Sequence, residues 1–237
     1  MLVAPGKFVF VHIPKTGGMW VREVLKHTVP EWQLRDTKVA HDGVLNLPDE
    51  DKLLPSFAFV RNPFAWYVSL FSMWQNTYLG GRANAKEGKG NWGGRGPETE
   101  YEQMWGEVLE GLPMGPEGFQ AAIRKGVLLP PVGESFNNFM GGAVVSPYAT
   151  FSDTLRRMVG VGTRLLKYEN LRLELEKTLV DFVGVLPERL ASRIRSTPVK
   201  HDSAHGDFAL YYLGARDIVD RVRYHDLDVL EAFEYAA

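Results

Sequence analysis

The sequence predicts an α/β fold of three layers, in which a central, mostly parallel sheet lies between helices. Short runs of β-branched and aromatic residues alternate along the chain with longer segments of helical periodicity. The composition agrees, because 45% of the 237 residues are hydrophobic and 24% are charged, as in a globular protein with a substantial core. In such sheets ligands bind at the carboxyl ends of the strands, so we expect the functional residues there.

The first strand is expected at residues 7–13 (KFVFVHI), an apolar run rich in Phe and Val that suits a buried strand. A glycine-containing loop at 14–18 follows it. Apolar residues then recur at helical spacing over 19–26, which predicts a helix. A weaker strand is expected at 38–40.

The second strong strand signal is SFAFVR at 56–61. Asn62 and Pro63 follow it, and they predict a helix start with Asn as N-cap and Pro in the first turn. The helix should run over 64–75. Between 79 and 97 the sequence is rich in glycine, and we expect a mobile loop or lid there.

The rest of the chain predicts further helices and one more strand. No linker rich in Pro, Ser or charge divides the chain, so we expect a single domain over residues 1–237. The expected elements are helices at 100–110 and 117–125, a helix that starts at Ser152 as N-cap, a strand at 163–168, a helix at 171–183 and a helical C-terminal segment at 208–233.

Charge and composition exclude several classes of function. The formal net charge of −2 gives no general basic surface, so we expect no nucleic-acid partner. The apolar stretch near the N-terminus is too short for a signal peptide or a membrane span, which predicts a cytoplasmic protein with no membrane partner. The absence of cysteine excludes disulfides, thiolate metal sites and a cysteine nucleophile, and we expect no metal.

The first motif is HIPKTGG at 12–18, at a junction of strand and helix. Backbone N–H groups of the glycine turn, the helix N-terminus and Lys15 could together bind a phosphate or sulfate. The pattern is not the P-loop of triphosphatases, because Lys15 precedes the glycines instead of following them. An ordinary turn with a solvated lysine is an equally good interpretation of this segment alone.

The second motif is Arg61-Asn62-Pro63, with Ser69 eight residues after Arg61. Arg61 leaves the end of a strand, and Ser69 should lie on the second turn of the next helix. A guanidinium suits bidentate contact with an oxyanion, so both side chains could converge on one phosphate. For either residue alone, an arginine paired with a carboxylate and a solvated serine would explain the sequence better.

Together the two motifs resemble those of a known family. Segments 14–25 (PKTGGMWVREVL) and 59–71 (FVRNPFAWYVSLF) are similar to the 5′-phosphosulfate loop and the 3′-phosphate motif of sulfotransferases that use 3′-phosphoadenosine-5′-phosphosulfate (PAPS). KYENL at 167–171 and HGDFALYY at 205–212 resemble two further segments of that family, which includes cytosolic, Golgi-type and bacterial members. The resemblance implies a P-loop NTPase-like fold and the transfer of a sulfuryl group from PAPS, with PAP as product.

The resemblance assigns the 5′ end of PAPS to the first motif. It implies that Lys15 contacts the oxygen that bridges sulfur and phosphate, and that Thr16, Gly17 and Gly18 donate hydrogen bonds to the 5′-phosphate. The sequence departs from the family at Gly18 and Met19, where cytosolic members usually carry hydroxyl residues. We therefore expect more of the contacts at these positions to come from backbone N–H groups.

The resemblance assigns the 3′ end of PAPS to later segments. Arg61 and Ser69 would hold the 3′-phosphate, and Trp20 and Tyr168 would contact the adenine. The Arg-Lys-Gly contact that the family makes before its Gly-Asp-Trp segment is missing, and His201-Asp202-Ser203 stands in its place. Lys200 or His201 is the candidate replacement.

His41 is the candidate catalytic base, in a segment that resembles the Lys-Thr-His segment of cytosolic sulfotransferases. A neutral imidazole can accept the proton of an acceptor hydroxyl as its oxygen attacks sulfur. The alternative is a loop histidine beside Asp42. For His12 and His205 the sequence favours structural or supporting roles over catalytic ones.

Two other functions remain open at this point. A small-molecule kinase on a related P-loop scaffold would have a similar anion loop, although the GxxxxGK[ST] pattern is missing. A non-catalytic nucleotide-binding relative is the second alternative, supported only by the departures from the family pattern. The sequence names no acceptor beyond a small molecule or a glycan with a phenol, alcohol or sugar hydroxyl.

Overall fold

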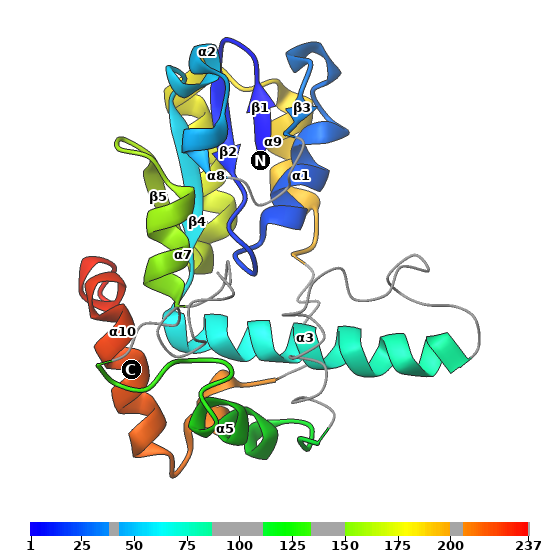
Figure 1. Cartoon of the computed structure of the whole chain (residues 1–237). Helices are drawn as coiled ribbons and strands as arrows, with labels where there is room; N and C mark the ends of the chain where they lie inside the picture. The colour runs from blue at the N-terminus through cyan, green and yellow to red at the C-terminus, as the bar shows by residue number, and fades with distance from the viewer. Residues whose placement is uncertain (38–42, 87–110, 134–149, 200–205, 237) are drawn as a thin grey trace. The chain divides into compact units, whose positions relative to one another are not determined.

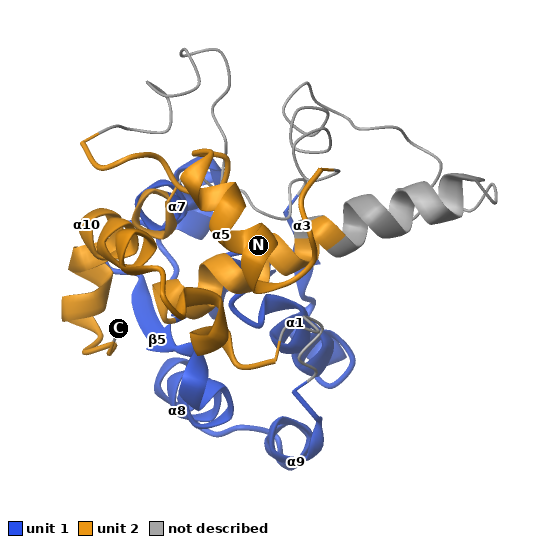
Figure 2. Cartoon of the chain, turned by 90° about the horizontal axis from the view of Figure 1, so that it is seen from below, with its two compact units in different colours: residues 1–61, 154–201 blue, residues 62–153, 202–237 orange. Residues whose placement is uncertain are grey.

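The computed structural model describes residues 1–37, 43–86, 111–133, 150–199 and 206–236 (Figure 1). The chain forms two compact units, and each is made from two separate stretches (Figure 2). Unit 1 comprises residues 1–61 and 154–201, and unit 2 comprises residues 62–153 and 202–237. No helix in the described ranges is both long and apolar enough to cross a membrane.

Unit 1 contains an open, mixed sheet of five strands in the order β3-β1-β2-β4-β5. Strands β2, β4 and β5 are adjacent and parallel, whereas β1 is antiparallel to both of its neighbours, β2 and β3. The expected α/β class is therefore confirmed, but the expectation of a mostly parallel sheet is not. The strands are β1 (Leu2–Ala4), β2 (Phe8–Val11), β3 (Arg35–Asp36), β4 (Ser56–Val60) and β5 (Arg164–Lys167).

A tight turn explains the antiparallel strand that the sequence analysis missed. Lys7 N–H donates to the carbonyl of Ala4 at 3.0 Å, which closes a four-residue turn between β1 and β2. Pro5 and Gly6 occupy its centre, and the φ of 67° at Gly6 fits the third position of a type II turn. The hairpin therefore forms from a three-residue strand that is too short to give a clear periodic signal.

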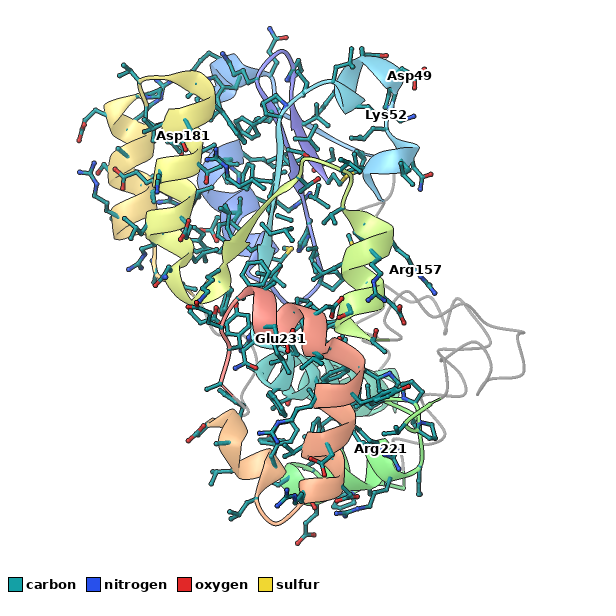
Figure 3. The ribbon with its side chains drawn as sticks, turned by 90° about the vertical axis from the view of Figure 1, so that its left-hand side faces the viewer. Asp49, Lys52, Arg157, Asp181, Arg221 and Glu231 are labelled. Carbon is teal, nitrogen blue, oxygen red and sulfur yellow. The ribbon has the colours of Figure 1, made fainter. Side chains whose placement is uncertain are left out.

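Helices lie on both faces of this sheet (Figure 3). One face packs through the aromatic rings of Phe8, Phe10, Phe57 and Phe59 against apolar residues of three helices. The small side chains of β2 and β4 on the opposite face are also buried. Because both faces of these strands are covered, the sequence of each strand is a nearly continuous apolar run. The helices of unit 1 are α1 (Gly18–Lys26), α2 (Asp49–Lys52), the second half of α7 (Phe151–Met158), α8 (Leu171–Val183) and α9 (Glu188–Ser196).

The outer surface of unit 1 carries ion pairs between exposed side chains. Lys52 pairs with Asp49 at 3.0 Å within α2 (Figure 3). Arg164 of β5 pairs with Asp181 of α8. Exposed pairs of this kind contribute little to stability, about 0–1 kcal/mol each. The buried aromatic layer, rather than these pairs, holds the helices on the sheet.

Unit 2 is helical and begins at Asn62. Asn62 Oδ1 accepts a hydrogen bond from Phe64 N–H at 2.9 Å, so the expected N-cap is confirmed. Helix α3 (Pro63–Lys86) then runs farther than the expected 64–75. The first part of the segment where we expected a mobile loop, 79–86, is therefore helical, and 87–97 lies outside the described residues.

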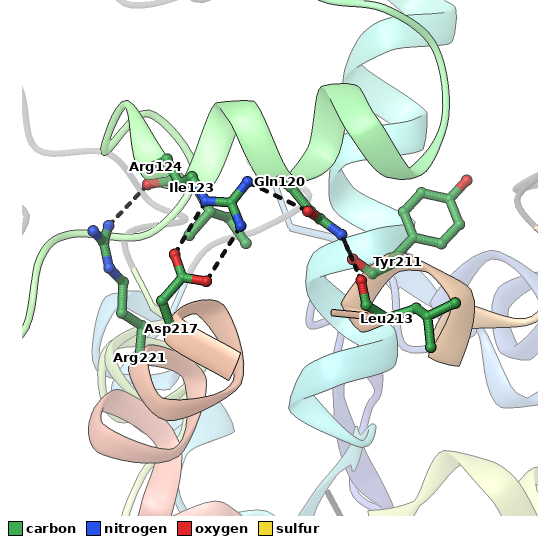
Figure 4. Close-up of polar contacts among 7 residues, drawn as sticks. All are labelled: Gln120, Ile123, Arg124, Tyr211, Leu213, Asp217 and Arg221. Carbon is green, nitrogen blue, oxygen red and sulfur yellow. Dashed lines mark hydrogen bonds and ion pairs between the residues drawn. The ribbon is translucent and has the colours of Figure 1, made fainter. Parts of the chain in front are cut away.

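Polar contacts fasten α5 (Pro116–Arg124) to the C-terminal part of unit 2 (Figure 4). Gln120 Nε2 donates to the carbonyl of Tyr211 in the 3₁₀ helix η4 (Phe208–Tyr212) and to that of Leu213, which directly follows this helix. Arg124 makes a two-point ion pair with Asp217 of α10 (Arg216–Ala232), at 3.1 and 3.2 Å. Arg221 of α10 donates to the carbonyl of Ile123 at 2.9 Å. These contacts join elements that lie about 90 residues apart in the sequence.

A buried carboxylate organises the interior of unit 2. Asp226 lies fully buried at a kink in α10, where its backbone departs from helical geometry (φ −124°, ψ 23°). The hydroxyl of Tyr67 donates to its Oδ2, and Ser152 N–H donates to its Oδ1, both at 2.7 Å. Burial raises the pKa of Asp226 to about 6, although both donors oppose the shift.

The start of α7 differs from the expectation by two residues. Thr150 Oγ1, not Ser152, accepts the capping hydrogen bond, from Asp153 N–H at 2.9 Å. Ser152 instead lies inside the helix, and its hydroxyl donates to Asp228. Ser and Thr are both good N-caps, so local sequence could not separate them.

Three of the other expected elements are present in the structure. The helices expected at 117–125 and 171–183 and the strand expected at 163–168 correspond to α5, α8 and β5. The C-terminal segment divides into η4 and α10. The strand expected at 38–40 and the helix at 100–110 lie outside the described residues.

Candidate anion-binding site

Three chain segments meet at one edge of the sheet of unit 1. Strands β2, β4 and β5 are adjacent and parallel, with Val11 opposite Ala58 and Val60 opposite Lys167. Their carboxyl ends therefore lie together. The loop 12–18 follows β2, Arg61 follows β4, and Tyr168 follows β5.

The loop after β2 has an unusual backbone. Lys15 has a φ of 63° and Gly17 a φ of 81°, both in the left-handed region. That region is uncommon for a residue with a side chain, so the loop holds Lys15 in a conformation that costs free energy. Thr16 is buried, and its hydroxyl donates to the carbonyl of Ile13 at 2.8 Å. This hydrogen bond closes the loop from inside.

Helix α1 begins directly after this loop. Gly17 is its N-cap and has no side chain that could accept hydrogen bonds from the first turn. The first-turn N–H groups at Gly18, Met19 and Trp20 point toward the N-terminal end, where the helix dipole favours an anion. Met19 is 69% exposed in this turn, whereas Gly18 and Trp20 are buried.

Tyr168 packs directly against the loop. A Cβ atom on Gly17 would lie 2.8 Å from Tyr168 Cε2, closer than real Cβ contacts allow. Gly17 is thus required both by its positive φ and by the tyrosine ring. Burial raises the pKa of Tyr168 above its usual value, while the nearby Arg61 partly offsets the shift. The phenol stays neutral at physiological pH and keeps its proton.

Arg61 connects the other two segments. Its Nη1 donates to the carbonyl oxygen of Lys15 at 3.3 Å, and its guanidinium carbon lies 4.9 Å from the centre of the Tyr168 ring. The structure thus brings together four residues that the sequence analysis had selected, namely Lys15, Gly17, Arg61 and Tyr168.

A pocket of about 520 Å³ adjoins Tyr168. Its volume is within the range of small-molecule sites, and its lining combines apolar side chains with groups that can form hydrogen bonds. The sequence analysis found Tyr168 but missed Arg172 and Val199. The pocket is lined by residues 168–173, at the start of α8, and by Val199.

Trp20 has a different environment from the one expected. It is buried in the core of unit 1, 5% exposed, and its indole N–H donates to the carbonyl of Thr197 at 3.2 Å. Arg172 Nη2 donates to the same carbonyl at 2.8 Å. Trp20 therefore holds the segment after α9 against α1, and a contact with adenine stays a prediction.

The described structure does not test the remaining predicted residues. Ser69 lies on the second turn of α3, as expected, and its side chain is buried, but α3 belongs to unit 2. A shared contact of Ser69 and Arg61 stays a prediction. His41, Lys200, His201 and His205 lie outside the described residues.

Comparisons with known proteins found no match to a family model, to a curated protein or to a solved structure. The case for a function therefore depends on the residues of this chain and their geometry. The strongest geometric feature is the loop 14–18, which Arg61 and Tyr168 support from two neighbouring strands.

Proposed function

We propose that this chain is a sulfotransferase, which moves the sulfuryl group of PAPS to the hydroxyl of a phenol, alcohol or sugar and releases PAP. One observation carries the proposal: Arg61 joins the backbone of Lys15 to the ring of Tyr168. Three of the four segments with sulfotransferase-like motifs thus begin or end at the same edge of the sheet. The proposal includes a P-loop-like arrangement, in which β2 leads through an anion-binding loop into α1.

In this proposal the 5′-phosphate binds at the N-terminus of α1. The first-turn N–H groups would donate to its oxygens, and the helix dipole would add favourable electrostatics. Thr16 would contribute through its backbone N–H, because its hydroxyl proton is donated to Ile13. The hydrogen bond expected from Thr16 would thus come from its backbone and not from its side chain.

Lys15 would act on the leaving group. During transfer the acceptor oxygen forms a bond to sulfur while the bond between sulfur and the bridging phosphate oxygen breaks. Negative charge grows on that bridging oxygen, and an ammonium group placed beside it lowers the barrier. The left-handed backbone of Lys15, held by Arg61, would fix the direction of the side chain. The acceptor proton would pass to a base, for which His41 remains the candidate.

The nucleoside would extend from the loop toward Tyr168. Arg61 contacts both the loop and the tyrosine ring, and its guanidinium could contact a phosphate of the same ligand. The pocket lined by 168–173 and Val199 offers a ring face and hydrogen-bonding groups for the base. The volume of about 520 Å³ is sufficient for a nucleobase with its ribose.

Calorimetric titration tests this function against the kinase alternative. We expect wild type to bind PAP without Mg²⁺, and Lys15→Ala to bind it more weakly. Lys52→Ala is the matched control, because Lys52 is a lysine of unit 1 that pairs with Asp49 on the surface. Tight ATP binding that requires Mg²⁺, together with no binding of PAP, would reject the proposal and favour a kinase.

A further inference from the structure

Two donors from different helices converge on the backbone carbonyl of Thr197. Trp20 of α1 donates its indole N–H to this oxygen at 3.2 Å, and Arg172 of α8 donates from Nη2 at 2.8 Å. A carbonyl oxygen has two lone pairs, so it can accept both hydrogen bonds. Thr197 is buried, and the two side chains take the place of the water that an exposed carbonyl would bind.

The short segment that follows has few other anchors. Residues 197–199 come directly after α9 and have no regular secondary structure. Pro198 has no backbone N–H to donate, and Val199 makes no hydrogen bond with any of the described residues. Within the described part of unit 1, the carbonyl of Thr197 is therefore the point that fixes this segment to α1 and α8.

Val199 connects this carbonyl to the pocket beside Tyr168. Of the described residues that line the pocket, 168–173 are consecutive, and Val199 alone comes from a distant part of the chain. Val199 and Tyr168 both pack against the apolar core of unit 1. Two residues of chain span at most about 7 Å, so a fixed carbonyl at Thr197 limits where Val199 can lie.

We propose that Arg172 and Trp20 are positioning residues of this pocket, which hold Val199 in place as part of its wall through the carbonyl of Thr197. They would act on a bound nucleoside through the wall, and this role of Trp20 needs no contact with the adenine. Arg172 also lines the pocket, so direct contact with a phosphate is the alternative that the test must separate from positioning.

Two probes make this separation: PAP, measured by calorimetry, and adenosine, measured by NMR titration. Adenosine has the base and the ribose but no phosphate. A residue that acts through the wall of the pocket should affect both probes equally, whereas a residue that touches a phosphate should affect PAP alone. The PAP measurement rests on the proposed function. Binding of adenosine without binding of PAP would support the pocket and reject that function.

Each donor can be removed by a substitution that keeps much of the side chain. Arg172→Met keeps an unbranched apolar stem and removes the guanidinium, at an exposed position where folding is little affected. Trp20→Phe removes the indole N–H and keeps an aromatic ring. Arg195→Met is the matched control, because Arg195 is an exposed arginine of α9 that pairs with the carboxylate of Glu176.

We expect each single variant to weaken the binding of both probes by about threefold, because the remaining donor still holds the carbonyl. The double variant should lose about 30-fold, more than the product of the single effects, and Arg195→Met should bind like wild type. Two independent contacts would give a loss equal to that product, which would overturn the shared role. Weaker binding of PAP but not of adenosine in Arg172→Met would show direct phosphate contact instead. If the double variant binds both probes like wild type, the inference is wrong while the proposed function stands.

A measurement on wild type covers the case in which Trp20→Phe does not fold. Nuclear Overhauser effects are expected between the methyl protons of Val199 and the base protons of bound PAP or adenosine. Saturated binding of either probe without these effects would contradict the placement of Val199 at the pocket. If neither probe binds wild type, both the inference and the proposed function are wrong.

Discussion

Arg61 Nη1 donates a hydrogen bond to the carbonyl oxygen of Lys15 at 3.3 Å, across a separation of 46 residues in the sequence. The contact joins the end of β4 to the loop after β2. It lies beside the left-handed backbone of Lys15, so it stabilises a conformation that a lysine rarely adopts. Arg61 therefore has a structural role in addition to any contact with a ligand.

Replacing Arg61 by Lys tests the value of the planar guanidinium. Lysine keeps the charge but loses both the stacking on Tyr168 and the fork of donors. We expect Arg61→Lys to weaken PAP binding by at least about tenfold in calorimetry. Arg189→Ala, which removes an exposed arginine of the same unit, should leave the affinity unchanged. Equal affinities of Arg61→Lys and wild type would contradict this role.

Alanine substitutions at two glycines with nearly equal φ angles distinguish the cost of backbone strain from the cost of a steric conflict. Gly17 and Gly162 have φ values of 81° and 85°, but only at Gly17 would a Cβ meet a neighbour, Tyr168. We expect Gly162→Ala to lower the free energy of unfolding by about 1 kcal/mol. Gly17→Ala should cost about 1–3 kcal/mol more, because the tyrosine ring must move. Urea denaturation measures both, and equal losses would show that the ring adapts without cost.

The buried Asp226 predicts a specific dependence of stability on pH. Its pKa is raised from 3.8 to about 6, so the folded state binds this proton more tightly than the unfolded chain. Its contribution is most favourable below about pH 4 and is lost as pH rises toward 6, with an amplitude of about 3 kcal/mol.

Asp226→Asn isolates this contribution, because its side chain does not titrate. The unfolding free energy of wild type minus that of the variant should fall between pH 4 and pH 6.5 and stay constant at higher pH. Urea denaturation at a series of pH values measures this difference. A constant difference across the whole range would show that Asp226 keeps an ordinary pKa.

Tyr67→Phe tests how the tyrosine hydroxyl affects the carboxylate of Asp226. The hydroxyl of Tyr67 donates to Asp226 Oδ2 and accepts from Phe151 N–H, and its donation lowers the pKa of Asp226. Removing it should cost about 1–3 kcal/mol and extend the loss of stability to higher pH. Tyr224→Phe, at an exposed position of α10, should have little effect. The prediction is wrong if both variants show the same stability and the same pH profile.

The sequence predicted the elements whose signals are local. The apolar runs of β2 and β4, the cap at Asn62 and the helix over 171–183 are all encoded in adjacent residues. The two shortest strands, β1 and β3, were missed because their stability comes from pairing with distant residues. Glycines after residue 79 suggested a loop, yet α3 continues to Lys86.

The candidate site could be predicted only as separate pieces. The motifs selected Lys15, Arg61 and Tyr168, but no local pattern shows that Arg61 donates to a backbone carbonyl of the loop. The contact of His12 with Gly18 was also missed, because it depends on how α1 leaves the loop. Packing of this kind is a tertiary property, which a single sequence does not display.

The central claim is that Lys15 and its loop carry sulfuryl transfer from PAPS. Incubation with ³⁵S-labelled PAPS and a panel of phenol, sugar and amine acceptors measures this directly. We expect wild type to label at least one hydroxyl acceptor, Lys15→Ala to be slower by about 100- to 1,000-fold, and Lys52→Ala to equal wild type. Transfer by Lys15→Ala at the wild-type rate, or the same lack of transfer by both across the panel, would contradict the claim.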